Sequence, residues 1–318
     1  MQRSLVGSEM CIRDSYTALF SSCVYEDLSK CSRMFMLQPR YLLHTGEGDR
    51  FGEAVHHIDV YAFDSLGIYR KMFRDKGAHL KNGYRMPIDL PEGKWTFLCL
   101  GGKVGDYEIG IFKTGIPQQF SLAVSPGITT LSDFRVKAYF EQKENLEYSL
   151  GELFFGRLDS MEITADNGGT GVVDLMKNTN KIEVRVKGIA DGSSARITSD
   201  NGRFNSENVT PADAGTIIYV PYYSASQADD TRVFQFDVLR LYTDGHLFLK
   251  LLNPDGTDVI SGFTKDLINA IMSSPAYHTQ EDLDREDTYL IELVLSKDGV
   301  IVSLRVNGWE TVSTTPEV

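Results

Sequence analysis

Short runs in which apolar and polar residues alternate recur along most of this 318-residue chain. The segment 181–187 reads KIEVRVK and alternates strictly, and Val302, Leu304 and Val306 repeat the same spacing near the C-terminus. A two-residue period places successive side chains on opposite faces of an extended strand. The pattern therefore predicts β-strands with one buried face and leaves little room for amphipathic helices.

Turn-forming pairs lie between these runs, among them Asn201-Gly202 and Asp298-Gly299. Asp298-Gly299 separates two alternating runs and is typical of a β-hairpin. Residues 264–274 have the best helical spacing and are followed by Pro275, and 172–178 could form a single helical turn. Strands at such close spacing, with one short helix in the second half, predict an all-β fold of antiparallel sandwiches.

The chain length suggests about two domains. Residues 166–171 read DNGGTG, which is typical of a turn or linker. We therefore predict one β-sandwich domain over 32–160 and a second over 161–318. Trp309 follows a turn near the C-terminus, and we expect it to pack in the core of the second domain.

The net charge is −12, with 44 acidic and 32 basic residues. Nucleic-acid binding needs clustered Lys and Arg to neutralise phosphates, so this charge speaks against a nucleic-acid partner. No apolar run approaches the ~18 residues of a membrane-spanning helix. Any attachment to a membrane is therefore expected to come from a lipid.

The N-terminal segment contains a candidate lipid-attachment site. Residues 1–15 read like the translation of a transposase sequencing adapter, and we exclude them from fold reasoning. Residues 16–22 then read as the remnant of a bacterial lipoprotein signal, which is cut before a cysteine. This pattern predicts a lipid on Cys23 and a tethering linker over 23–31.

Two further cysteines, Cys31 and Cys99, leave two alternatives open. In an exported protein they could form a disulfide. They could equally be independent thiols, with Cys99 a small buried residue. No CxxC motif occurs, so no zinc site is predicted.

Motifs that carry catalysis are missing from the sequence. We find no nucleophile elbow, phosphate-binding loop or zinc-protease motif. His56 and His57 are neighbours in an expected strand and should point to opposite faces. The glycine-rich segment 101–105 is expected to be a loop between strands, and the acidic run 282–287 a solvated linker. The sequence therefore predicts no enzyme, no metal site and no cofactor.

Several short motifs, in a fixed order, carry a family resemblance: Cys23–Cys31, Ile58–Asp64, Leu90–Phe97, Leu153–Gly156, Asn178–Val184, Asp200–Phe204, Leu239–Leu241 and Asn307–Trp309. With this order and spacing, the chain resembles the FimB-type fimbrial anchor proteins of the bacteroidetes fimbrillin superfamily. Cys99 departs from the family pattern, which often has another residue there, often aromatic.

The resemblance implies two tandem transthyretin-like antiparallel β-sandwich domains. It also implies a lipoprotein of the outer membrane, exposed at the cell surface, that anchors a fimbria or serves as a minor subunit. The implied partners are fimbrillin subunits, joined by a strand that one subunit adds to a sheet of another.

An alternative is a lipid-anchored surface adhesin or glycan-binding module. Tyr219, Tyr222 and Tyr223 cluster around Pro221 and could stack on sugars. The more common role of aromatic residues in strands is packing within the core.

Overall fold

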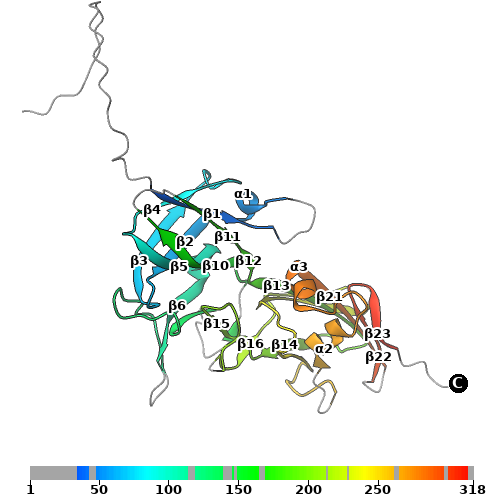
Figure 1. The fold of residues 1–318 in the computed structure, drawn as a ribbon. Helices are drawn as coiled ribbons and strands as arrows, with labels where there is room; N and C mark the ends of the chain where they lie inside the picture. Colours follow the sequence, from blue (N-terminus) through cyan, green and yellow to red (C-terminus); the bar gives the residue numbers. More distant parts are fainter. Residues whose placement is uncertain are drawn as a thin grey trace, which may run out of the picture. The chain divides into compact units, whose positions relative to one another are not determined.

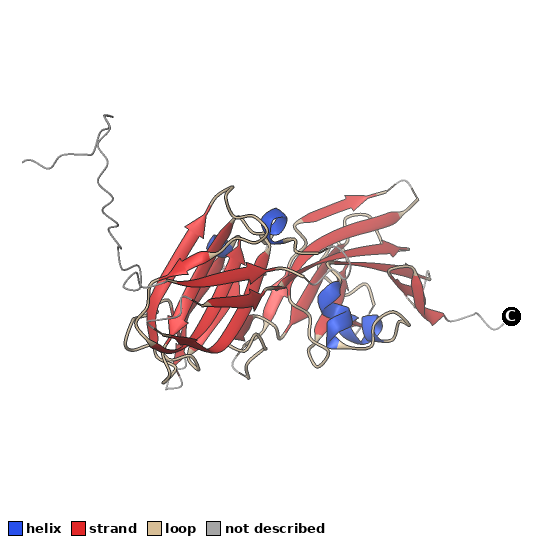
Figure 2. Cartoon of the chain, turned by 45° about the horizontal axis from the view of Figure 1, so that its top comes forward, coloured by secondary structure: helices blue, strands red, loops and turns tan. Residues whose placement is uncertain are grey.

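Five β-sheets carry most of the regular structure, and the helices are few and short (Figures 1 and 2). The computed structural model describes residues 34–42, 48–113, 119–138, 145–146, 149–164, 169–212, 214–227, 229–260, 265–296 and 300–313. All elements below belong to one unit, Arg33–Val318.

A five-stranded sheet lies at the centre of the N-terminal half, in the order β12-β10-β5-β2-β3. Its strands are β2 (His57–Phe63), β3 (Tyr69–Lys76), β5 (Gly93–Gly102), β10 (Leu153–Ile163) and β12 (Met176–Lys177). All pairings within it are antiparallel. Both faces of β2 are buried, because its apolar residues pack alternately into two different cores and the charged Asp59 is buried as well.

A three-stranded sheet covers one face of the central sheet, in the order β11-β1-β4. It consists of β1 (Phe35–Arg40), β4 (Met86–Ile88) and β11 (Thr170–Asp174). The rings of Phe35 and Phe97 stack with centroids 5.8 Å apart. Ile58, Val60 and Ala62 face this layer.

A four-stranded sheet, in the order β15-β8-β6-β7, covers the other face. Its strands are β6 (Tyr107–Lys113), β7 (Gln119–Ser121), β8 (Phe134–Ala138) and β15 (Arg203–Asn205). Phe134 contacts Tyr61 and Phe63 edge-on, with ring centroids 5.2 and 6.0 Å apart. The N-terminal half therefore has three layers of sheet.

Two sheets form the C-terminal half, and their facing side chains share one core. The first is β17 (Tyr223–Ser226), β18 (Thr231–Leu239), β13 (Thr179–Lys187), β21 (Thr288–Leu295), β22 (Ile301–Val306) and β23 (Trp309–Ser313), in that spatial order. The second is β20 (Lys265–Asp266), β19 (Leu247–Leu252), β14 (Ser194–Ser199), β16 (Ile217–Tyr219) and β9 (Asn145–Leu146). Ile182, Val184 and Val186 are buried between them, as their alternation predicts.

The helices are short: α1 (Phe51–Ala54), the 3-10 turn η2 (Val104–Asp106), α2 (Leu267–Met272) and α3 (Gln280–Arg285). The predicted helix over 264–274 is confirmed in its centre as α2. Asp266 caps α2 by accepting a hydrogen bond from the Ile268 amide at 3.0 Å. The side chains of Leu267, Ile268 and Ile271 are buried in the core.

Two short strands cross between the halves. β9 comes from the N-terminal part of the chain but pairs with β16. β15 comes from the C-terminal part but pairs with β8. The strands β11 and β12 lie beyond residue 160 and pair with β1 and β10. The division into domains at 160 and 161 stays a prediction.

Several local expectations are wrong. Residues 172–178 hold strand rather than a helical turn, because β11 pairs in parallel with β1 over 170–174. The run 282–287 is not a linker throughout, because α3 covers 280–285. Trp309 is 51 % exposed on the edge strand β23, so it is not a core residue. The pairs β1–β11, β13–β21 and β9–β16 are parallel, although the remaining sheet pairings are antiparallel.

Asp298 and Gly299, where a hairpin turn is expected, lie outside the described residues, but the two strands on either side pair as a hairpin requires. β21 and β22 pair in antiparallel register from Ile291 with Val306 onward. The amide of Ser296 donates to the carbonyl of Val300 at 2.8 Å.

Candidate functional site

Of the predicted cysteine sites, only Cys99 lies in the described part of the chain. Cys99 is a free, fully buried thiol in β5, and burial raises its pKa. Cys23 and Cys31 lie outside the described residues. The lipid on Cys23 and the pairing of Cys31 with Cys99 therefore stay predictions.

The predicted tyrosine cluster does not form a single surface. Tyr219 is completely buried, its hydroxyl donates to Asn201 Oδ1 at 2.8 Å, and it accepts from the Leu239 amide at 3.1 Å. Tyr219 is therefore unavailable to a ligand, because its ring and hydroxyl are both used in the core. Tyr222 is half-buried, and Tyr223 is 49 % exposed on the outer strand β17.

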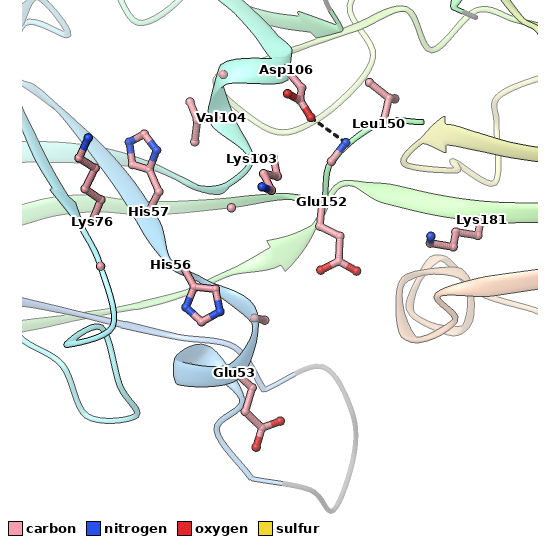
Figure 3. Close-up of a pocket in the computed structure, with 15 residues that line it drawn as sticks. Glu53, His56, His57, Lys76, Lys103, Val104, Asp106, Leu150, Glu152 and Lys181 are labelled. Atoms are coloured by element: carbon pink, nitrogen blue, oxygen red, sulfur yellow. Dashed lines mark hydrogen bonds between the residues drawn. The ribbon is translucent and has the colours of Figure 1, made fainter. Parts of the chain in front are cut away.

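A pocket of about 970 Å³ is lined by residues from both halves of the unit (Figure 3). Glu53 and Ala54 come from α1, and Lys76 from the end of β3. The segment 102–106 and Leu150–Glu152 form another wall, and Lys181 reaches it from β13. The glycine-rich segment 101–105 is a loop only in part, because β5 ends at Gly102 and η2 begins at Val104; residues 102–105 border this pocket.

His56 and His57 both line this pocket, although adjacent strand residues were expected to point apart. β2 begins only at His57, so His56 belongs to the preceding loop and is not bound by the strand alternation. His57 Nε2 lies 2.9 Å from Oδ1 of the fully buried Asp59. Asp59 also accepts two hydrogen bonds of 2.6 Å from Arg74.

The acidic groups of the pocket are engaged by the protein itself. Glu152 pairs with Lys177 at 2.9 Å, and Asp106 accepts from the Gly151 amide at 2.9 Å. Among the described residues, no group of three or more His, Cys, Asp or Glu side chains could hold a metal ion. The described lining of the pocket is therefore of mixed charge, with acidic residues beside Lys76, Lys103 and Lys181.

Gly102 shapes the floor of the pocket. Its φ is +88°, and an added Cβ would lie 2.3 Å from the Glu152 carbonyl oxygen. The Lys103 amide donates to that same carbonyl at 2.8 Å. Only glycine fits here, because the backbone has a left-handed conformation and the chain from 150 to 152 passes directly against it.

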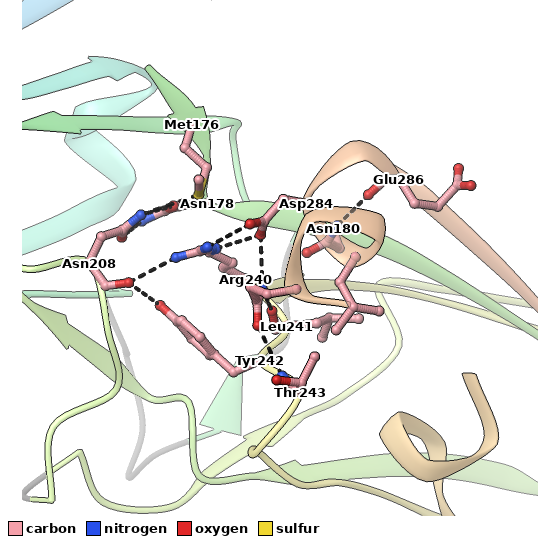
Figure 4. Close-up of polar contacts among 12 residues, drawn as sticks. Met176, Asn178, Asn180, Asn208, Arg240, Leu241, Tyr242, Thr243, Asp284 and Glu286 are labelled. Carbon is pink, nitrogen blue, oxygen red and sulfur yellow. Dashed lines mark hydrogen bonds and ion pairs between the residues drawn. The ribbon is translucent and has the colours of Figure 1, made fainter. Parts of the chain in front are cut away.

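A buried polar network lies where the two halves meet (Figure 4). Arg240 Nε and Nη2 each donate to Asp284 at 2.7 Å. Arg240 Nη1 donates to the Asn208 carbonyl at 2.9 Å, and the Tyr242 hydroxyl donates there at 3.1 Å. The side chains of Asn178 and Asn208 exchange hydrogen bonds of 2.5 and 3.0 Å. The network joins α3, the turn after β15, and the residues directly after β18 and directly before β13.

The sequence contains a signal for α3 that we did not use in predicting the run 282–287. The Thr279 hydroxyl oxygen accepts from the Asp282 amide at 3.2 Å, and the Thr279 amide donates to Asp282 Oδ2 at 2.9 Å, which is a capping box. Hydrogen bonds from the His278 amide and the Thr279 hydroxyl lower the pKa of Asp282 to about 2. The pairing of Arg240 with Asp284 had no such signal, because the two residues lie 44 positions apart.

Edge strands are a second candidate surface. β23 is the last strand of the six-stranded sheet, and in the described part of the chain it pairs only with β22. An edge strand presents unpaired backbone amides and carbonyls to which another chain can add a strand. Trp309 lies exposed at this edge.

Comparison with known proteins identifies the family. A family model described as "Fimbrillin-A associated anchor proteins Mfa1 and Mfa2" matches residues 28–315. The chain belongs to this Mfa2 family of fimbrial anchor proteins. The family is structural and non-enzymatic, which agrees with the sequence-based prediction. The minor fimbrium anchoring subunit Mfa2 of Porphyromonas gingivalis is 23 % identical over 303 residues, covering 90 % of this chain and 87 % of that protein.

Solved structures share the fold of this Mfa2 family chain. The fimbrial anchor protein Mfa2 of P. gingivalis superposes with a TM-score of 0.71 at 21 % identity, covering 89 % of this chain and 99 % of that one. A Bacteroides thetaiotaomicron protein proposed to bind polysaccharide gives a TM-score of 0.74 at 23 % identity, covering 89 % and 98 %. The mostly-β, multi-sheet architecture is therefore an Mfa2-like fold.

Among the described residues, no helix has the length and apolar character needed to cross a membrane.

Proposed function

We propose that this chain anchors a fimbria at the cell surface, at the outer-membrane end of the fibre. The observation that carries the proposal is the family match over residues 28–315, which runs through all five sheets. The P. gingivalis relative is named an anchoring subunit, and the family description names fimbrillin. We therefore propose a fimbrillin subunit as the partner and a lipid on Cys23 as the attachment to the membrane.

We also propose that the two halves are tandem transthyretin-like sandwich domains. Support comes from the pairings, because most strands before residue 178 pair with one another, as do most strands after it. In the N-terminal half, the three-stranded sheet β11-β1-β4 would then be a third layer added to the sandwich. β9 and β15 are the exceptions, and both are short.

The proposed docking site for fimbrillin is the open edge of β23. Backbone groups on that edge would extend the six-stranded sheet by one strand, and the indole of Trp309, 51 % exposed, would lose solvent when the strand is added. Large aromatic side chains of this kind contribute much of the energy of protein interfaces.

Proline in the edge strand tests this proposal. Proline lacks the backbone N–H and disturbs strand pairing, so Thr311→Pro in β23 should weaken capture of a purified fimbrillin subunit by at least about tenfold. Ser224→Pro in β17, at the opposite edge of the same sheet, is the matched control and should retain capture. Circular dichroism establishes that both variants fold. Equal capture by both variants, or loss only with Ser224→Pro, would exclude the β23 edge.

A further inference from the structure

Leu66 and Ile128 are the two most exposed large apolar residues that the structure describes, at 78 % and 70 %. Leu66 lies in the turn between β2 and β3, and Ile128 in the loop before β8. Single exposed apolar residues are common and need no explanation. Here, however, the two residues lie on neighbouring turns that are joined to each other.

Backbone hydrogen bonds fasten the two turns together. The Leu131 amide donates to the Gly67 carbonyl at 2.7 Å, and the Tyr69 amide to the Thr129 carbonyl at 2.8 Å. Within the first turn, Asp64 Oδ1 accepts from the Leu66 amide at 2.9 Å. Because each turn is held by its own backbone contacts, the two side chains are presented to solvent by an ordered surface.

These turns lie at the end of the sheets where the described chain begins. Phe35 stacks on Phe97, which pairs with Ala62, and β2 ends one residue later. A second contact supports the same placement. Lys71 Nζ donates to the carbonyl of Asp89 at 3.0 Å, and the neighbouring Ile88 pairs with Phe35, the first residue of β1. β1 therefore starts at the same end as the Leu66 turn.

We propose that Leu66 and Ile128 enter the surface of the lipid bilayer and orient the protein on it. The inference rests on the proposed lipid at Cys23. The eleven residue-to-residue steps from Cys23 to Met34 span at most ~40 Å when the chain is fully extended. A lipid at Cys23 would thus hold this end of the sheets near the bilayer. Two apolar side chains are too few for stable binding alone, but beside a covalent lipid they suffice to select an orientation.

The surrounding charges favour a bilayer without a strong negative charge. The chain carries a net charge of −12, and an anionic surface would repel it. Beside the tips, the Arg70 guanidinium is paired with Asp64 and the Lys71 ammonium is half-exposed. We therefore choose phosphatidylethanolamine and phosphatidylcholine vesicles as the probe.

The experiment attaches a lipid chemically, so that it does not depend on natural lipidation. The full chain carries Cys11→Ser, Cys31→Ser and Trp309→Phe, and a thiol-reactive phospholipid is coupled to Cys23. The emission of the remaining tryptophan, the buried Trp95, is measured in this chain without a reporter and subtracted. Cys99 is fully buried and stays unreacted. Leu66→Trp and Ile128→Trp introduce reporters, and Val300→Trp, at a position 59 % exposed in the C-terminal half, is the matched control. The vesicles contain brominated acyl chains, which quench tryptophan.

On these vesicles, the reporters at positions 66 and 128 should lose about half of their emission, while the reporter at 300 keeps nearly all of it. Adding Leu66→Asp should reduce the quenching at position 128. Quenching at 66 and 128 no greater than at 300, with the protein floating with the vesicles, would overturn the proposal. If the tryptophan emission at positions 66 and 128 changes with fimbrillin and not with vesicles, these two turns contact a protein, and the proposal is overturned as well. Failure of natural lipidation would instead count against Cys23.

Discussion

Arg240 and Asp284 form a buried bidentate ion pair, with both N–O distances at 2.7 Å and side-chain exposures of 10 % and 5 %. The pair fastens α3 to the end of β18. Arg240 also donates to the Asn208 carbonyl, so it holds the turn after β15, the strand that pairs with β8 of the N-terminal half. These contacts thus link three segments that all belong to the predicted second domain, 161–318.

Removing one partner of this pair should destabilise the fold strongly. Asp284→Asn leaves a buried guanidinium without its counter-charge, so the free energy of unfolding should fall by about 3–5 kcal/mol. Asp174→Asn is the control, since Arg40 and Asp174 make a similar pair with side-chain exposures of 35 % and 59 %, and it should cost less than about 1 kcal/mol. Urea denaturation measures both. Equal losses would contradict a buried, energetically important pair.

The imidazole of His246 should titrate above its ordinary pKa. Asp266 Oδ2 lies 3.1 Å from His246 Nδ1, and this hydrogen bond raises the His246 pKa. The resulting stability is complete below the unfolded-state pKa of ~6.5 and is lost as pH rises through the higher folded-state value. NMR titration measures it, with His246→Gln to assign the signal. Asp266→Asn should lower the His246 pKa, and an unchanged value would contradict the assigned cause.

Gly102 should tolerate no side chain. Gly102→Ala places a Cβ 2.3 Å from the Glu152 carbonyl in a left-handed backbone, so it should cost at least about 2 kcal/mol. Gly105→Ala is the control, because a Cβ added there would meet nothing within 4 Å and the φ of Gly105 is not positive. Thermal unfolding compares the two variants. A stable Gly102→Ala protein would mean that the pocket wall can move.

Alternation in the sequence predicted the strands well where one face is buried. Ile182, Val184 and Val186 are buried as expected, and so are Leu304 and Val306. The three-layered N-terminal half was missed because β2 has two buried faces. Tyr61 and Phe63 face the second core, and a strand buried on both sides shows no alternation.

Features that depend on distant pairing were not visible in the sequence. β11 is a strand because β1 pairs with it across more than a hundred residues. The pocket likewise combines Glu53, Lys103 and Lys181 from three separate segments. Local periodicity carries no information on such contacts. The exposure of Trp309 follows from the place of β23 at a sheet edge, which its own sequence does not reveal.

Release of fimbriae tests the central claim most directly. In the native host, the gene is deleted and restored with either the wild-type chain or Cys23→Ala, and fimbrillin is measured in cells and in cell-free medium. The account predicts that deletion moves most fimbrillin into the medium, that the wild-type chain returns it to the cells, and that Cys23→Ala does not. Fimbriae that stay attached to the deletion strain would contradict the anchoring role.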